Sequence, residues 1–105
     1  MVISQAWVHP DGAHGEHYVR LAADFDEFLQ DQPGFVARRL VRSLEDPTHF
    51  IHLREWRAIA DYEAMTTLPA YQDHIAALSE HVDTSRYQSG YPREYAEVVV
   101  ATIAP

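Results

Sequence analysis

The sequence contains neither cysteine nor lysine among its 105 residues, so all eight basic residues are arginine. Without cysteine, the chain has no disulfide, no thiolate nucleophile and no cysteine-bound zinc or iron–sulfur site. Without lysine, no side-chain amine is present to form a Schiff base with a carbonyl substrate. These two absences exclude several classes of covalent and metal chemistry before any motif is considered.

Long apolar runs and positive charge are also scarce. No run approaches the roughly 18 apolar residues of a membrane-spanning helix, and the first residues lack the basic and apolar segments of an export signal. The formal net charge of −8 opposes binding to phosphate backbones and to anionic membranes. We therefore expect a cytoplasmic protein with neither nucleic acid nor membrane as a partner.

What the chain does contain is typical of a small folded domain. Apolar residues make up 47% and charged residues 23% of the sequence, which is the usual balance of a globular protein. The length suits one domain with one modest core. We find no internal repeat or linker, and expect a single domain over residues 1–105.

Apolar periodicity predicts four strands and three helices. An amphipathic helix over residues 15–32 has apolar residues at helical spacing and ends at Pro33-Gly34. The other expected elements are strands over 2–8, 35–44, 49–56 and 94–103, and short helices over 59–66 and 69–81. Treating the two short helices as one helical region, the order is β-α-β-β-α-β, the split βαβ arrangement of ferredoxin-like α+β folds.

Such a fold has an antiparallel sheet with helices on one face. The predicted strands carry apolar groups on both faces: Phe50 and Trp56 alternate with Ile51 and Leu53. A second sheet should therefore cover the face away from the helices, and an identical chain packed about a two-fold axis is its simplest source. We expect a homodimer.

The third predicted strand also indicates a small-molecule site. Its period of two places four side chains on one face, namely Phe50, His52, Arg54 and Trp56. Tyr62 on the first short helix, with Tyr71 or His74 on the next, can close over that face. An apolar cleft with a few convergent polar groups is the usual form of a ligand site. We expect Arg54, Phe50, Tyr71 and His74 to contact a substrate there.

The pieces of this region resemble one known family. They are PGF at 33–35, a strand that ends in Glu55-Trp56, a short helix, and LPAYQDH at 68–74. In this order and spacing they resemble the antibiotic biosynthesis monooxygenase family over nearly the whole chain. The resemblance implies a small dimeric α+β barrel, and two chemistries known in that family become alternatives for this chain.

The first alternative, and our leading hypothesis, is a cofactor-independent monooxygenase that oxidises an aromatic or polyketide-like phenol with dioxygen. The resemblance assigns catalytic positions to Trp56, His52 and Tyr62, although the family typically has asparagine where this chain has His52. A neutral imidazole can act as a base, since its ordinary pKa is about 6.5. Dioxygen reacts much faster with a carbanion or phenolate than with a phenol. Arg54 or His52 can stabilise that anion.

The second alternative is a heme-degrading monooxygenase. The resemblance places its axial ligand at His74, because PAYQDH matches the pattern that carries the ligand, and its first-strand asparagine at Gln5. A third hypothesis is a non-catalytic member of the fold that binds a metabolite in the same cleft. Only the second hypothesis requires a cofactor, and none of the three requires a bound metal other than heme iron.

Three other polar groups are interpreted as structural, because their spacing points to no particular chemistry. They are the first histidines (His9, His14 and His17), an acidic helix face (Asp24, Asp26 and Glu27) and the arginines of the second strand (Arg38, Arg39 and Arg42). We expect the first two groups to be exposed to solvent. We expect the arginines to pair with carboxylates or to lie at the dimer interface.

Overall fold

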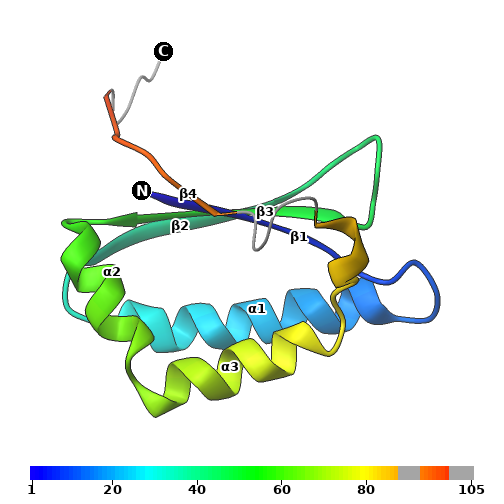
Figure 1. Ribbon diagram of the computed structural model, residues 1–105, viewed down its shortest axis with the longest axis horizontal. Helices are drawn as coiled ribbons and strands as arrows, with labels where there is room; N and C mark the ends of the chain where they lie inside the picture. Colours follow the sequence, from blue (N-terminus) through cyan, green and yellow to red (C-terminus); the bar gives the residue numbers. More distant parts are fainter. Residues whose placement is uncertain (88–92, 100–105) are drawn as a thin grey trace.

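The computed structural model describes residues 1–87 and 93–99, which form an antiparallel sheet with helices on one face (Figure 1). The elements are β1 (Val2–Trp7), α1 (His14–Gln30), β2 (Phe35–Arg42), β3 (His49–Trp56), α2 (Ile59–Thr66), α3 (Pro69–Ser79), the 3-10 turn η1 (Thr84–Arg86) and β4 (Arg93–Tyr95). Within these residues the sheet order is β2-β3-β1-β4, and every neighbouring pair is antiparallel. The predicted ferredoxin-like α+β fold is confirmed.

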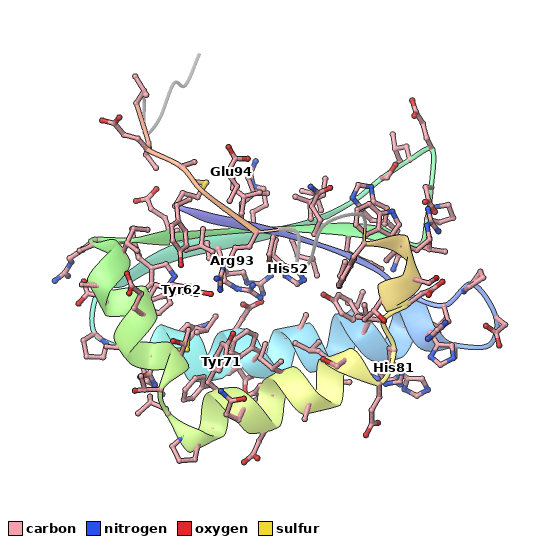
Figure 2. The ribbon with its side chains drawn as sticks, in the orientation of Figure 1. His52, Tyr62, Tyr71, His81, Arg93 and Glu94 are labelled. Atoms are coloured by element: carbon pink, nitrogen blue, oxygen red, sulfur yellow. The ribbon has the colours of Figure 1, made fainter. Side chains whose placement is uncertain are left out.

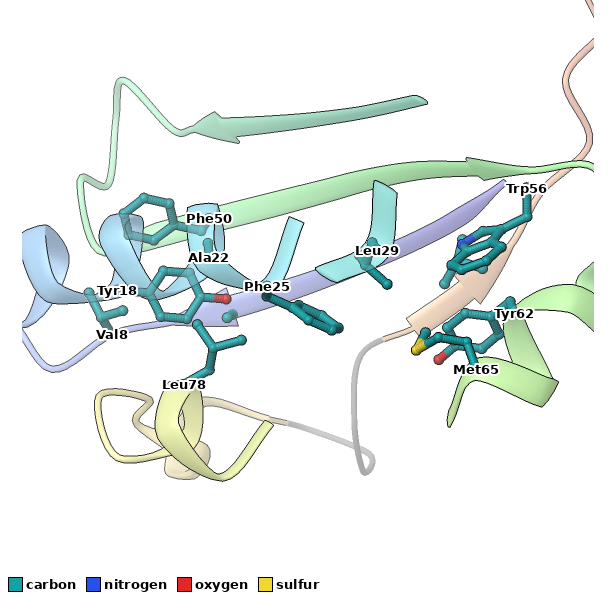
Figure 3. Packing of buried hydrophobic residues seen from close by; sticks show 12 residues of the cluster. Val8, Tyr18, Ala22, Phe25, Leu29, Phe50, Trp56, Tyr62, Met65 and Leu78 are labelled. Atoms are coloured by element: carbon teal, nitrogen blue, oxygen red, sulfur yellow. The ribbon is translucent and has the colours of Figure 1, made fainter. Parts of the chain in front are cut away.

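The core lies between the sheet and the helices. On β1 the residues Val2, Ser4 and Ala6 are buried while their neighbours are half-exposed, as the period of a strand requires. The buried residues of α1 recur at helical spacing along one stripe. Figure 3 shows the core from end to end, with Trp56 near α2 and Phe50 near the start of α1. The sheet thus supplies one wall and the helices supply the other.

Gly34 fixes the turn between α1 and β2. Its φ of +82° lies in the left-handed region, where a side chain is strained. A Cβ at this position would also overlap the carboxylate of Asp61 on α2. The Pro33-Gly34 pair therefore stops the helix as predicted, and the glycine additionally allows α2 to pack against the turn.

The last strand is shorter than predicted. β4 covers only Arg93–Tyr95 and pairs with β1, where Tyr95 faces Val2. The amide of Ala96 still donates to the carbonyl of Met1, over 2.9 Å. Residues 97–99 pair with none of the described strands, so they form no strand despite their β-branched side chains. Residues 100–103 of the predicted strand lie outside the described residues.

The described helices bear on two further expectations. None of them is long and apolar enough to cross a membrane. All of them cover the same face of the sheet, and Figure 1 shows the opposite face of β2, β3 and β1 without a helical layer. On that opposite face a hollow of about 300 Å³ is lined by Ala37, Arg39, Leu53 and Glu55, among others.

Candidate functional site

Two small cavities lie between the sheet and the helices. The larger, about 100 Å³, is lined by Tyr18 and His52 on one side and by the segment from Leu78 to Thr84 on the other. The smaller, about 30 Å³, is lined by Tyr62, Tyr71 and Arg93, among others. Figure 2 shows His52 and Arg93 directed from the sheet toward the helices, where Tyr62 and Tyr71 face them. Phe25, Arg54 and Ile75 line both cavities and separate them.

Arg54 is the charged group between the two cavities. Its side chain is only 11% exposed, and its guanidinium lies 5.0 Å from the centre of the Phe25 ring. Both Nε and one terminal nitrogen donate to Oδ1 of Asp26 over 3.3 Å. The second carboxylate oxygen of Asp26 lies 3.1 Å from Nε of Arg38. Two arginines therefore share one carboxylate, which leaves the cluster with a net positive charge.

Asp26 is not the solvated helix residue that the sequence suggested. It is 1% exposed, because α1 turns it inward beside the apolar stripe that contains Ala22, Phe25 and Leu29. Such burial of a carboxylate is tolerated when a cation pairs with it. Its arginine partners come from β2 and β3, which are distant in the sequence, so the helix pattern alone did not identify the pair.

His52 is buried and neutral. Its Nε2 forms a hydrogen bond with the hydroxyl of Tyr18, over 2.5 Å. Burial first, and then the positive charges of Arg54 and Arg38, together lower the pKa of His52 from about 6.5 to about 3. The expectation that this imidazole titrates near pH 6.5 is therefore wrong. As a weak base that stays uncharged, His52 is better suited to hold Tyr18 than to remove a substrate proton.

Tyr62 contributes a polar group to the smaller cavity. Its hydroxyl accepts a hydrogen bond from Nη1 of Arg93, over 2.7 Å. Its ring meets those of Trp56 and Tyr95 edge-on, each at 6.0 Å. Trp56 is buried behind Tyr62 and lines neither cavity. Its indole Nε1 has no acceptor among residues 1–87 and 93–99.

The remaining predicted contacts are divided between core and cavity. Tyr71 on α3 lines the smaller cavity. Phe50 packs against the Tyr18 ring at 5.0 Å and lines neither cavity. His74 packs against Phe25 and Phe28 at ring distances of 5.2 and 5.3 Å and also lines neither. The structure thus places His52 at one cavity, Tyr62 at the other and Trp56 beyond both, with Arg54 between them.

Sequence reasoning missed three side chains of this site. Tyr18 lies at one of the apolar positions of the helix predicted over residues 15–32, but a tyrosine buried among apolar residues normally needs a hydrogen-bond partner. Asp26 lies directly after a stripe position. Arg93 comes just before the predicted last strand, and only the pairing of β4 with β1, where Arg93 faces Ser4, directs it toward the cavity. Of the three, Tyr18 offered the clearest signal.

The residues assigned to heme do not fit that group as they are placed here. Gln5 lies on the opposite face of the sheet, where its Oε1 accepts a hydrogen bond from Nε2 of His49 over 2.8 Å. His74 is held against two phenylalanine rings and faces neither cavity. Both cavities are far smaller than a porphyrin. Heme binding through His74 would require α3 to move.

Comparison with known proteins agrees with this architecture. The family model described as antibiotic biosynthesis monooxygenase matches residues 1–77. The chain belongs to the antibiotic biosynthesis monooxygenase family. The resemblance seen in its sequence is therefore confirmed, although a search of curated proteins gives no match.

Solved structures of the same fold include members of this family. SnoaB, described as a cofactor-independent oxygenase from Streptomyces nogalater, is 18% identical with a TM-score of 0.76, covering 96% of this chain and 95% of SnoaB. A putative antibiotic biosynthesis monooxygenase from Caulobacter crescentus CB15 is 16% identical with a TM-score of 0.77, covering 94% of this chain and 88% of its own. At such identities the similarity to these structures establishes the fold.

Proposed function

We propose that this antibiotic biosynthesis monooxygenase family member oxidises a phenolic aromatic compound with dioxygen, without a bound cofactor. The observation that carries the proposal is Arg54, a buried cation that lines both cavities. It shares its only carboxylate partner among the described residues, Asp26, with Arg38. A cation in such a site lowers the pKa of a bound phenol and stabilises the anion on which dioxygen acts.

The reaction can be written for an anthrone-type substrate. Loss of one proton from the ring CH₂ to solvent gives an enolate whose oxygen lies beside the Arg54 guanidinium. The electron-rich carbon forms a C–O bond with dioxygen, and the resulting peroxide takes up a proton. Loss of water with the second C–H hydrogen leaves a carbonyl. One dioxygen is consumed, one water is released, and the CH₂ group becomes C=O.

The other polar groups position the substrate in this scheme. Neutral His52 and Tyr18 form a hydrogen-bonded wall of the larger cavity. Tyr62 presents its hydroxyl to the smaller cavity. Arg93, which donates a hydrogen bond to that hydroxyl, contributes a second cation there. Because ligand pockets usually enclose about 300–1,000 Å³, a substrate with several rings requires the side chains of Phe25 or Ile75 to move and join the two spaces.

The first prediction concerns the catalytic contribution of Arg54. The double variant Asp26→Asn/Arg54→Met removes the cation without leaving its carboxylate unpaired. We expect its kcat/KM to fall about 100-fold, the usual effect of removing one donor to a developing oxyanion. Oxygen uptake with 1,8-dihydroxyanthrone, in chelator-containing buffer with no flavin or heme added, measures this rate, and absorbance measures the quinone formed.

Arg57→Met is the matched control, because this arginine is exposed one residue beyond β3. It should retain the wild-type rate, and wild-type protein should consume one dioxygen per substrate above the uncatalysed background. A double variant as active as wild type would contradict the role of Arg54. Wild-type protein that binds the anthrone but does not accelerate its oxidation would instead favour the non-catalytic hypothesis.

We further propose that the functional unit is a homodimer joined through the open face of the sheet. Ile3, Ile51 and Leu53 lie half-exposed on that face, and Leu53 lines its hollow. Burying these apolar groups against the same face of a second chain is favourable. A two-fold axis brings identical faces of two chains together in this way. The half-exposed apolar residues support this arrangement because a monomer would leave them in water.

Leu53→Asp tests the dimer. A carboxylate at the centre of an apolar interface is costly to bury, so we expect the sedimentation mass to fall from twice the chain mass of 12.0 kDa to that of one chain. Leu44→Asp is the control, since Leu44 is fully exposed at the β2–β3 turn, and it should leave the mass unchanged. A wild-type protein that sediments as a monomer, or a dimer unaffected by Leu53→Asp, would refute this interface.

A further inference from the structure

Four histidines from three segments gather where α1 begins and α3 ends. We call His9, His14, His17 and His81 the histidine cluster. Nδ1 of His14 lies 2.9 Å from Nδ1 of His81. The ring of His9 lies 5.3 Å from that of His14, and the ring of His17 stacks on that of His81 at 5.5 Å. Figure 2 shows His81 at the far end of α3 from Tyr71.

The sequence predicted exposed histidines here, but it did not predict that His81 would join them. Only His17 of the first three is largely exposed, while His9 and His14 are half-buried. Among the described residues, no group of three or more potential ligands is arranged to hold a metal ion. The distinctive feature is instead the direct contact between two imidazole nitrogens.

That contact limits how many protons the pair can carry. At 2.9 Å one ring must donate and the other must accept, so at least one of His14 and His81 stays neutral. If both were imidazolium, two N–H groups would point at each other. His17 accepts a hydrogen bond from Arg20 through Nδ1, over 2.7 Å, which adds positive charge beside the pair. The contact is therefore stable only while at least one of the two rings is neutral.

The surrounding charges act on the histidine cluster in both directions, and the carboxylate of Asp83 interacts with His9. Partial burial and the neighbouring His14 and His17 lower the pKa of His81, and His9 lowers it further. Glu80 opposes this effect, and it is the one carboxylate with a resolved influence on His81. A histidine whose pKa is lowered in the closed structure binds protons more readily when that structure opens. Acid therefore favours separation of His81 from His14.

His81 is placed where such a separation would change the larger cavity. Val82 and Thr84, just after it, line the wall of that cavity opposite His52. This wall is attached to the end of β1 through backbone hydrogen bonds from His9 to the His81 carbonyl, over 3.0 Å, and from Asp83 to the Trp7 carbonyl, over 2.7 Å. The side-chain contact of His81 with His14 ties the same segment to α1.

We propose that the histidine cluster is a pH-sensitive latch on the larger cavity. The latch is closed while His14 and His81 share a proton, and it opens when both rings become charged. Opening loosens residues 81–84 and widens access between α1 and α3 below about pH 6.5, the ordinary pKa of histidine. This inference concerns access to the cavity and holds whatever reaction, if any, takes place there.

Hydrogen exchange of the intact protein tests the latch. The amides of Val82 and Asp83 are hydrogen-bonded, so their protection reports whether the segment is closed. Between pH 7.5 and 5.5, after correction for intrinsic rates, we expect their protection to fall by up to about tenfold, because only one of these pH units lies below the ordinary histidine pKa of about 6.5. Amides of β3 respond to pH through His52, and this response should be the same in wild type and in His81→Gln, which separates local opening from global unfolding.

His81→Gln should abolish this extra pH response, because glutamine keeps a polar side chain but cannot become charged. His14→Gln provides the same test from α1 if the first variant folds poorly. His49→Gln is the matched control, since that histidine lies on the opposite face of the sheet and binds Gln5. Equal protection of Val82 and Asp83 at both pH values, or a pH response that survives His81→Gln, would overturn the proposal.

Discussion

Lowering the pH from 7 to 4 is expected to reduce the free energy of unfolding by about 3 kcal/mol through His52 alone. The pKa of His52 is about 3 in the folded protein, because of burial and then of Arg54 and Arg38, against an ordinary value of 6.5. Between these two values the unfolded chain binds a proton that the folded chain does not. Stability is therefore complete above about pH 6.5, and it declines by about 1.4 kcal/mol per pH unit below it.

Urea unfolding at intervals from pH 7 to pH 4 measures this decline, and His52→Gln isolates its source. Glutamine can still form a hydrogen bond with Tyr18 but takes up no proton. The free energy of unfolding of the variant should fall less with pH than that of wild type, and the difference should equal the amount assigned to His52. The contribution of His81 remains in both proteins. Parallel curves for wild type and variant would show that His52 titrates normally, and hence that it is not enclosed as described.

Replacing Asp26 by asparagine is expected to lower the free energy of unfolding by about 3 kcal/mol, the lower end of the range for breaking a buried ion pair. Asparagine has nearly the same shape, so the loss reflects charge rather than packing. Arg54, 11% exposed, would then lack a carboxylate partner. Arg38 is 41% exposed and can turn toward water, which keeps the effect from being larger.

Two variants serve as controls for this measurement. Asp24→Asn changes an exposed carboxylate on the same helix and should alter stability by no more than about 0.5 kcal/mol. Arg38→Ala removes the more exposed arginine and should cost no more than about 1 kcal/mol, as exposed ion pairs do. If chemical denaturation showed that Asp26→Asn lowers the free energy of unfolding no more than Asp24→Asn does, the buried charge cluster could not be intact in solution.

Asp26, Arg38 and Arg54 form a cluster of charges beneath α1, and both predictions above depend on this cluster. Asp26 restrains the guanidinium of Arg54 at the boundary between the two cavities. Burial and then the same cations keep His52 neutral beside Tyr18. A protein that needed only a core could fill this space with apolar side chains at no loss of stability. The function proposed above gives these charges a role, which is to stabilise the anion formed from the substrate.

The sequence predicted the fold well because its signals are local. Alternation along residues 49–56 identified the inward side of β3, including His52 and Arg54, without any knowledge of partners. Pro33-Gly34 marked the end of α1. The last strand was predicted less well, since β-branched residues indicate a strand only where a neighbour offers backbone groups, and none of the described strands pairs with residues 97–99.

The site was less predictable because its chemistry depends on groups from distant segments. By sequence His52 had an ordinary pKa, and it acquires a value of about 3 only when folding buries it and places it beside Arg54 and Arg38. Trp56, Tyr62 and His52 were expected around one hollow, yet Phe25, Arg54 and Ile75 divide that space in two. Side-chain volume at the centre of a core is decided by three-dimensional packing, which no periodicity encodes.

The order and facing of the strands and helices were determined by the sequence itself, because the periods of 2 and 3.6 residues specify which side chains must leave water. Which charges meet was decided only by the tertiary structure. Asp26 meets arginines from two strands, and His81 meets a histidine 67 positions away. Electrostatic interactions depend on distance in space and on burial, and a linear chain specifies neither until it has folded.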